Sequence, residues 1–197
     1  MKGFHFSLNL GLIGTDDSRI DIILDYLKEK TELTKSKDSK SEFQFIYENV
    51  PLKMKIFQFT HFEDLSDDIK NLKKLDAIIV AVNLYNDQVM SNLNFNSYKN
   101  FCDKFNFNGI AVLVGTDPYL IEQTNPPVSR SINEFVLIQK TKEIKFHYCS
   151  KIQNPQKDIA DIFKKVLNYV ILRLEFTNPE MFDRAKKNSK DFAGRYL

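Results

Sequence analysis

Residues 8–27, LNLGLIGTDDSRIDIILDYL, have the pattern of an apolar strand followed by a glycine-containing loop and an amphipathic helix. Residues 6–13 have strand character, and apolar side chains then recur at the spacing of one helical face, at Ile20, Ile23, Leu24 and Leu27. A strand that turns through glycine into a helix N-terminus is the local arrangement that binds phosphate groups in many α/β proteins. The segment therefore favours an α/β fold and raises the question of whether this loop can hold a phosphate.

Strand and helix patterns alternate along the rest of the chain. After a polar segment that we expect to be a loop (34–42), the expected strands are an antiparallel hairpin over 43–59 that turns at 49–51, then 77–83, 109–115 and 144–150. The expected helices are 18–30, 64–74, 89–105, 129–142, 158–174 and a terminal helix that begins near Pro179, after an N-cap at Thr177 or Asn178.

This order predicts a three-layer α/β sandwich around a mostly parallel six-stranded sheet with one antiparallel strand. We expect residues 1–175 to form this domain and residues 176–197 to form a C-terminal helical extension. In such sheets the ligand cleft lies at the carboxyl ends of the strands, which here includes the loop at Gly14.

Composition limits the classes of function. Lys and Arg number 28 against 26 acidic residues, a net charge of +2, which gives no case for direct nucleic-acid contact. The two cysteines lack CxxC spacing and the histidines His5, His61 and His147 are isolated, so we expect no metal site and a reducing compartment. The apolar run at 75–84 is too short to span a bilayer, and no lipidation motif is present, so we expect a soluble intracellular protein without a membrane anchor.

The order of elements resembles that of the Ras-like small GTPases. The resemblance covers about residues 5–174, with LGLIG at the start, LDAIIVAVNL in the middle, AVLVGTD next and YCSK near the end. It implies the P-loop NTPase-like topology of this family, together with a guanine-nucleotide site built from several short motifs.

The phosphate-binding motif of that family reads G-x-x-x-x-G-K-[ST], in which the lysine neutralises the phosphates and the hydroxyl binds magnesium. Counted from Gly14, Arg19 stands at the second glycine, Ile20 at the lysine and Asp21 at the hydroxyl residue. One lost attraction or added repulsion at about 4 Å is worth roughly 4 kcal/mol at an effective dielectric of ~20, which corresponds to several decades of affinity. Carboxylates also suit a helix N-terminus, so we expect the protein's own acids to take the place of a phosphate.

The other family motifs are also replaced. At the D-x-x-G motif, Gln58 stands at the aspartate and His61 at the glycine. At the base-reading N-K-x-D motif, Thr116 and Asp117 stand at the first two positions and Tyr119 at the aspartate that selects guanine. A partial match survives only in YCSK. We therefore expect no catalytic residues, no cofactor and no GTP hydrolysis.

Among degenerate members of the GTPase fold, the chain is similar to the centromere protein M family of inner-kinetochore subunits, in LIGTDDS, LDAIIVAVNLYND and YCSK. That resemblance implies a non-catalytic pseudo-GTPase that acts as a scaffold, docks to a large helical subunit of a multiprotein complex and resides at the kinetochore in the nucleus. Without it, the cytoplasm is the expected location. Two alternatives stay open: a divergent but active guanine-nucleotide-binding GTPase, and a pseudo-GTPase that takes part in membrane-trafficking adaptor assembly.

Four aromatic or sulfur-containing side chains are candidate partner contacts, because such residues often anchor interfaces: Phe62, Tyr85, Met181 and Phe182. For Met181 and Phe182 the alternative is that they hold the terminal helix against the chain's own domain.

Overall fold

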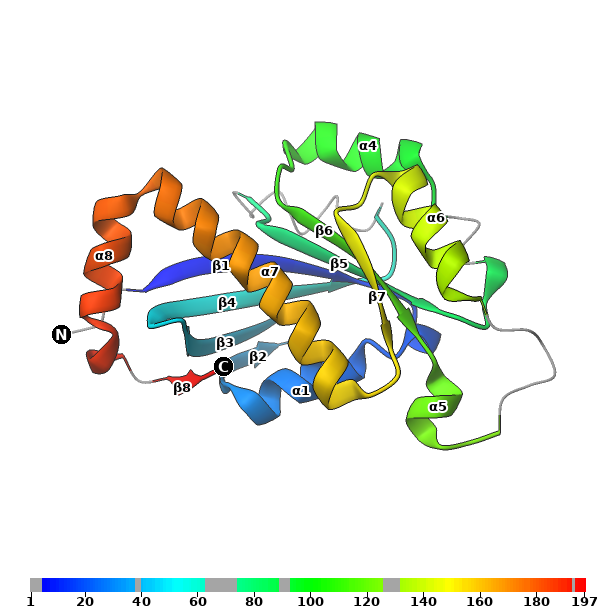
Figure 1. Cartoon of the computed structure of the whole chain (residues 1–197), viewed down its shortest axis with the longest axis horizontal. Coiled ribbons are helices and arrows are strands. Elements are labelled where there is room, and N and C mark those ends of the chain that lie inside the picture. The colour runs from blue at the N-terminus through cyan, green and yellow to red at the C-terminus, as the bar shows by residue number, and fades with distance from the viewer. Residues whose placement is uncertain (1–4, 38–39, 63–73, 89–92, 126–131, 193) are drawn as a thin grey trace.

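The computed structural model describes residues 5–37, 40–62, 74–88, 93–125, 132–192 and 194–197. A mixed β-sheet crosses the molecule, with helices packed against it (Figure 1). The strands are β1 (Phe6–Ile13), β2 (Glu32–Lys37), β3 (Lys40–Tyr47), β4 (Val50–Phe59), β5 (Ala77–Asn83), β6 (Ile110–Thr116), β7 (Tyr148–Ile152) and β8 (Arg195–Tyr196). The helices are α1 (Asp21–Lys30), α4 (Phe95–Phe105), α5 (Pro118–Glu122), α6 (Glu134–Ile144), α7 (Pro155–Thr177) and α8 (Pro179–Lys187).

The sheet is mostly parallel, as predicted, but it has more strands than predicted. Its order is β2-β3-β4-β1-β5-β6-β7, and β8 pairs with β3. The run from β4 to β7 is parallel, β3 is antiparallel to β4, and β2 is antiparallel to β3. The expected six strands with one antiparallel member are therefore corrected to eight strands, of which β2 and β8 were not predicted.

The prediction of a loop at 34–42 is wrong for residues 34–37 and 40–42, because polar composition does not distinguish a loop from an edge strand; residues 38–39 lie outside the described residues. Residues 32–36 are exposed, and among the described strands β2 pairs with β3 alone, so neither face of this strand needs apolar side chains. The following hairpin is as predicted, although its turn lies at Glu48 and Asn49, whose φ angles of 48° and 62° suit a two-residue hairpin turn.

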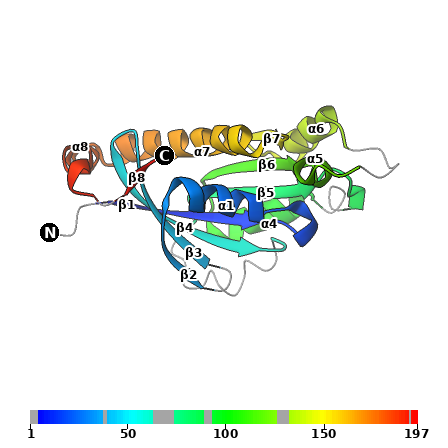
Figure 2. The same cartoon turned by 90° about the horizontal axis from the view of Figure 1, so that it is seen from below.

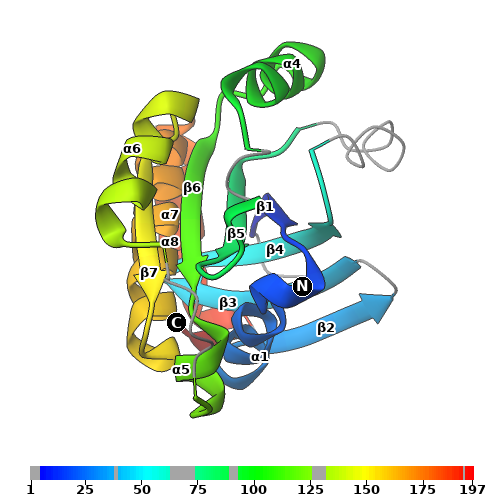
Figure 3. The same ribbon diagram turned by 90° about the vertical axis from the view of Figure 1, so that its right-hand side faces the viewer.

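Two hydrophobic cores lie on the two faces of the sheet. Along β1, alternate side chains such as Leu8, Leu10 and Leu12 enter the core that α1, α7 and α8 cover. On the other face, Val80 and Val82 of β5 pack with the buried side chains of α4 and α6. Figures 2 and 3 show α7 and α4 on different sides of the sheet, which is consistent with a three-layer arrangement.

Most predicted helices are present with shifted bounds. The terminal helix α8 begins at Pro179 after Asn178, and α7 extends three residues beyond the predicted range at each end. The five-residue helix α5 was not predicted. The expected helix at 64–74, and the starts expected at 89–92 and 129–131 for two others, lie outside the described residues. Within the part of the chain that the structure describes, no helix is both long and apolar enough to cross a membrane.

A histidine at the start of β7 links this strand to β6. The Ala111 N–H donates a hydrogen bond to His147 Nδ1 (3.0 Å), and the His147 N–H donates to the Ala111 carbonyl (2.9 Å). His147 is exposed as a residue, but the Tyr169 ring lies against one side of its imidazole with centroids 5.9 Å apart. This desolvation lowers the pKa of His147 below its usual value of about 6.5. An unprotonated Nδ1 is also what the hydrogen bond from Ala111 requires.

We expect the protein to lose stability as the pH falls from about 6.5 through the lower pKa that His147 has in the folded state. In this range the unfolded chain binds a proton at His147 more readily than the folded chain does, so protonation favours unfolding. The measurement is the midpoint of urea unfolding at several pH values between 7.5 and 5. His147→Asn is the matched control, since its amide oxygen can accept the same bond without titrating. Equal losses of stability in both proteins would contradict the prediction.

Candidate functional site

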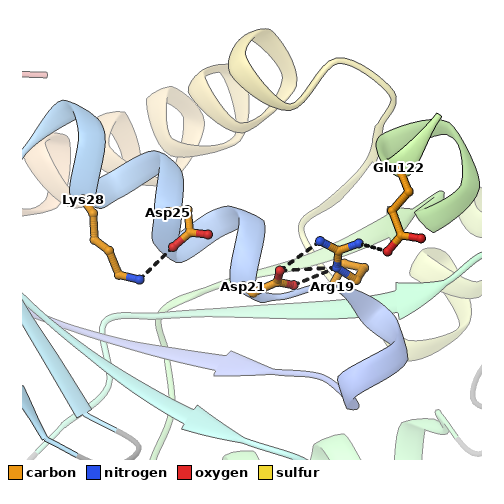
Figure 4. Close-up of polar contacts among 5 residues, drawn as sticks. All are labelled: Arg19, Asp21, Asp25, Lys28 and Glu122. Carbon is orange, nitrogen blue, oxygen red and sulfur yellow. Dashed lines mark hydrogen bonds and ion pairs between the residues drawn. The ribbon is translucent and has the colours of Figure 1, made fainter.

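The loops that follow β1, β5 and β6 meet at the carboxyl edge of the sheet, where α/β proteins of this kind bind ligands. This edge contains most of the residues that the sequence analysis compared with the GTPase motifs. Figure 4 shows part of it, with Arg19 and Asp21 at the start of α1 and Glu122 at the end of α5.

The loop after β1 is folded on itself. Asp16–Ser18 form a short 3₁₀ turn, in which the Ser18 N–H donates to the Thr15 carbonyl (2.9 Å) and the Arg19 N–H donates to the Asp16 carbonyl (3.4 Å). The Gly14 N–H donates to the carbonyl of Phe59 at the end of β4 (2.9 Å). These three amides are directed at carbonyl groups of the chain itself, whereas a phosphate-binding loop directs its amides at the anion.

Gly14 is required by the close packing of this loop. A Cβ atom at this position would lie 2.3 Å from Ser18 Oγ and 2.7 Å from the Ile20 side chain. Ile20, at the position of the family lysine, is partly buried and packs against the core under α1. The glycine therefore serves the packing of the loop, and Ile20 packs against the hydrophobic core.

Arg19 is the only basic residue between Gly14 and Asp21, and its guanidinium contacts a carboxylate on each of two sides (Figure 4). It adopts a left-handed conformation with φ 52°, and its guanidinium contacts Asp21 with Nε–Oδ1 and Nη2–Oδ2 distances of 3.0 Å. It also forms an ion pair with Glu122. The hydrogen bonds from Arg19 hold the pKa of Asp21 below its usual value, although burial opposes this shift. The loop's single cation thus neutralises carboxylates of the protein.

Asp17 connects the loop after β1 to the loop after β5. Its carboxylate accepts hydrogen bonds from Asn86 Nδ2 (2.9 Å) and Asn83 Nδ2 (3.3 Å) and from the Thr15 hydroxyl. Burial alone would raise the pKa of Asp17, but these three hydrogen bonds outweigh it and lower the pKa. A negative charge therefore occupies the mouth of the loop at neutral pH.

Thr116, Asp117 and Tyr119 lie at the end of β6, at the N-cap of α5 and within α5, respectively. Thr116 is fully buried and donates to the Val82 carbonyl (3.1 Å), while the Asp117 carboxylate caps α5 by accepting from the Leu120 N–H (3.0 Å). Tyr119 lies in α5, and its ring contacts Tyr85 edge to face with centroids 4.9 Å apart. Tyr85 and Tyr119 thus join the loop after β5 to the loop after β6. Arg19 and Glu122 join the loop after β1 to the loop after β6 in the same way.

His61, but not Gln58, lines a pocket of about 370 Å³. Gln58 is within β4, opposite Leu12 of β1, while His61 follows β4 and lines the pocket. The lining also includes Ile13, Gly14, Phe62, Val80 and Leu93. Among the described residues that line this pocket there is no lysine or arginine, the side chains that most often pair with phosphate groups.

The candidate partner contacts differ in exposure. Phe62 and Phe182 are 8% and 1% exposed and belong to the two cores, so neither presents its ring to a partner in this conformation. Tyr85 is half-buried against Tyr119, and Met181 is 46% exposed. Figure 1 places α8, which carries Met181 and Phe182, at the opposite end of the molecule from α5.

Three residues of the site were missed by the sequence analysis: Asn83, Asn86 and Glu122. Asn83 ends the buried strand β5 and Asn86 follows it, which marks both as residues of the carboxyl edge, but nothing in the sequence pairs them with Asp17. For Glu122, the signal was Asp117-Pro118, an N-cap followed by proline at the first helical position, which predicts the helix that carries this glutamate.

Comparison with models of known protein families found no match, and neither did comparison with curated proteins.

Proposed function

We propose that this chain is a non-catalytic pseudo-GTPase that acts as a structural subunit of a protein complex. Six neighbouring strands, β3-β4-β1-β5-β6-β7, form a run in which β3 alone is antiparallel, and this agrees with the sheet that the resemblance to Ras-like GTPases implies.

The observation that carries the proposal is the occupation of the α1 N-terminal loop by the chain's own charges. Asp17 holds the loop after β5, and Arg19 is held between Asp21 and Glu122. A triphosphate at this place would meet two carboxylates with lowered pKa values and would have to break both ion pairs of the arginine. Each such repulsion lowers the affinity for the triphosphate by powers of ten.

For the partner, the resemblance to centromere protein M favours a large helical subunit of the inner kinetochore and hence a nuclear location. The exposed side chain of Met181 is the candidate contact that the structure leaves accessible. A role in membrane-trafficking adaptor assembly is the second form of the same scaffold proposal, and identification of the proteins that copurify from native extract separates the two.

The direct test is analysis of the nucleotide released when the purified protein is denatured, followed by titration of the protein with GTP and Mg²⁺. We expect no stoichiometric nucleotide and no binding tighter than about 1 mM. We expect the same of the double variant Ile20→Lys, Asp21→Ser, because Arg19, Thr116 and Tyr119 still differ from the family motifs. Asp25→Ser, on the exposed side of α1, is the control for unspecific effects of removing a carboxylate.

A guanine nucleotide recovered at one equivalent per chain would instead establish the active-GTPase alternative. Micromolar affinity in the double variant would show that the base-reading positions matter less than proposed.

A further inference from the structure

The segment Gly194–Leu197 fills a short gap in the sheet. β2 pairs with β3 only from Lys40 to Gln44, whereas β8 pairs with β3 in parallel at Phe45 and Ile46. Because β4 occupies the other edge of β3 along its whole length, β8 must lie on the same edge as β2. Figures 1 and 2 show β8 beside β3 and close to α1.

Three kinds of contact hold this segment. The Leu197 N–H donates to the Ile46 carbonyl (3.0 Å), and the Leu197 side chain packs, partly buried, against the core. The Arg195 guanidinium donates to the carbonyl of Glu29 in the last turn of α1 (3.1 Å). The carbonyls of a last helical turn lack partners within the helix and form the negative end of its dipole, so they favour a cation.

The segment is held over a short length. β8 comprises two residues, pairs on one side with β3, and leaves the Tyr196 side chain 66% exposed. Segments with so few buried contacts open at a small fraction of the free energy of global unfolding. When β8 leaves, the backbone of Phe45 and Ile46 becomes an unpaired edge, which is a template for another strand.

We propose that this edge of β3, together with the last turn of α1, is a docking slot for an extended segment of a protein partner, and that Gly194–Leu197 closes it in the free chain. The partner segment pairs in parallel with Phe45 and Ile46. It carries a basic side chain for the Glu29 carbonyl and, two positions later, an aliphatic side chain for the core. This inference goes beyond the scaffold proposal and does not depend on whether the chain binds a nucleotide.

The partner segment and the chain's own Gly194–Leu197 compete for the slot, and this competition determines the affinity of the partner segment. The partner strand adds to the sheet edge through backbone hydrogen bonds, a common mode of peptide recognition. Its apparent affinity is reduced in proportion to the fraction of molecules in which the slot is open, so any change that removes the chain's own segment strengthens binding.

The test uses a fluorescently labelled peptide with the sequence of residues 190–197, KDFAGRYL, as the probe. Fluorescence anisotropy compares its binding to the full chain and to a variant that ends at Phe192. We expect at least ~10-fold tighter binding to the shortened variant. Peptides with Arg195→Ala or Leu197→Asp should bind at least several-fold more weakly, whereas the matched control peptide with Tyr196→Ala should bind like the parent.

A second variant opens the slot without shortening the chain. A Cβ atom at Gly194 would lie 3.2 Å from Phe45 Cα and 2.8 Å from the Phe192 ring, so Gly194→Val should displace the segment and give the same gain in peptide binding. The proposal is overturned if neither opened protein binds the peptide, or if the full chain binds it equally well. It is also overturned if both opened variants fail to fold, because the segment would then be part of the structural core.

Discussion

Replacing Phe182 with alanine should lower the free energy of unfolding by about 3–5 kcal/mol, the range for removal of a buried phenylalanine ring. The ring is 1% exposed within the core formed with α1 and α7, with the Phe6 ring at a centroid distance of 6.4 Å and Lys186 Nζ 4.5 Å from its centroid. Its loss leaves a cavity between α8 and the sheet. Urea unfolding followed by circular dichroism measures the change.

Met181→Ala is the control, because Met181 is the preceding residue on the same helix and is 46% exposed. We expect this variant to stay within ~0.5 kcal/mol of the original protein, as substitutions at exposed positions usually do. If both variants behave like the original protein, α8 is a dispensable extension. If Phe182→Ala alone is destabilised, residues 176–197 are part of the same cooperative unit as the sheet.

Gly109→Ala should destabilise the fold by about 2–3 kcal/mol, near the upper end of the range for overpacking. A Cβ atom at Gly109 would lie 2.1 Å from the carbonyl oxygen of Asp76, a backbone atom that cannot turn aside. That carbonyl accepts the Ile110 N–H (3.2 Å), and the Asp76 carboxylate accepts the Asn9 N–H (3.0 Å). Displacement of this backbone would therefore disturb the starts of β5 and β6 and their link to β1.

Gly11→Ala is the matched control for this substitution. Its added methyl group would meet only side-chain atoms, at 3.3 Å from Ile78 Cγ2 and 3.5 Å from Leu75 Cδ1, so a small adjustment suffices. We expect a clearly smaller loss for Gly11→Ala than for Gly109→Ala in thermal unfolding. A reversed order would mean that the backbone at Asp76 yields more easily than the side chains beside Gly11.

The central strands were predictable from the sequence because apolar patterning specifies them directly. β1 and β5 have the predicted bounds, since each is a run of side chains that must be covered by helices. β2 and β8 were not predictable in the same way. Both pair only with β3 at the edge of the sheet, so their pattern is set by pairing to a neighbour rather than by burial.

The sequence analysis also placed Gly14, Arg19 and Tyr119 in loops after parallel strands, and the structure brings them to one edge as the strand order required. The contacts between them were not readable. The ion pair of Arg19 with Glu122 joins residues 103 positions apart, and the bond from Asn86 to Asp17 joins residues 69 positions apart. Such pairings depend on how loops meet after the sheet has formed, which local periodicity does not encode.

The ties between the three loops also bear on how such a molecule is controlled. A small GTPase changes shape when its ligand changes, because the ligand's γ-phosphate holds the mobile loops in place. In this chain the side chains of Asp17 and Arg19 link the three loops from within. We therefore expect these three loops to keep one arrangement whether or not a ligand is present.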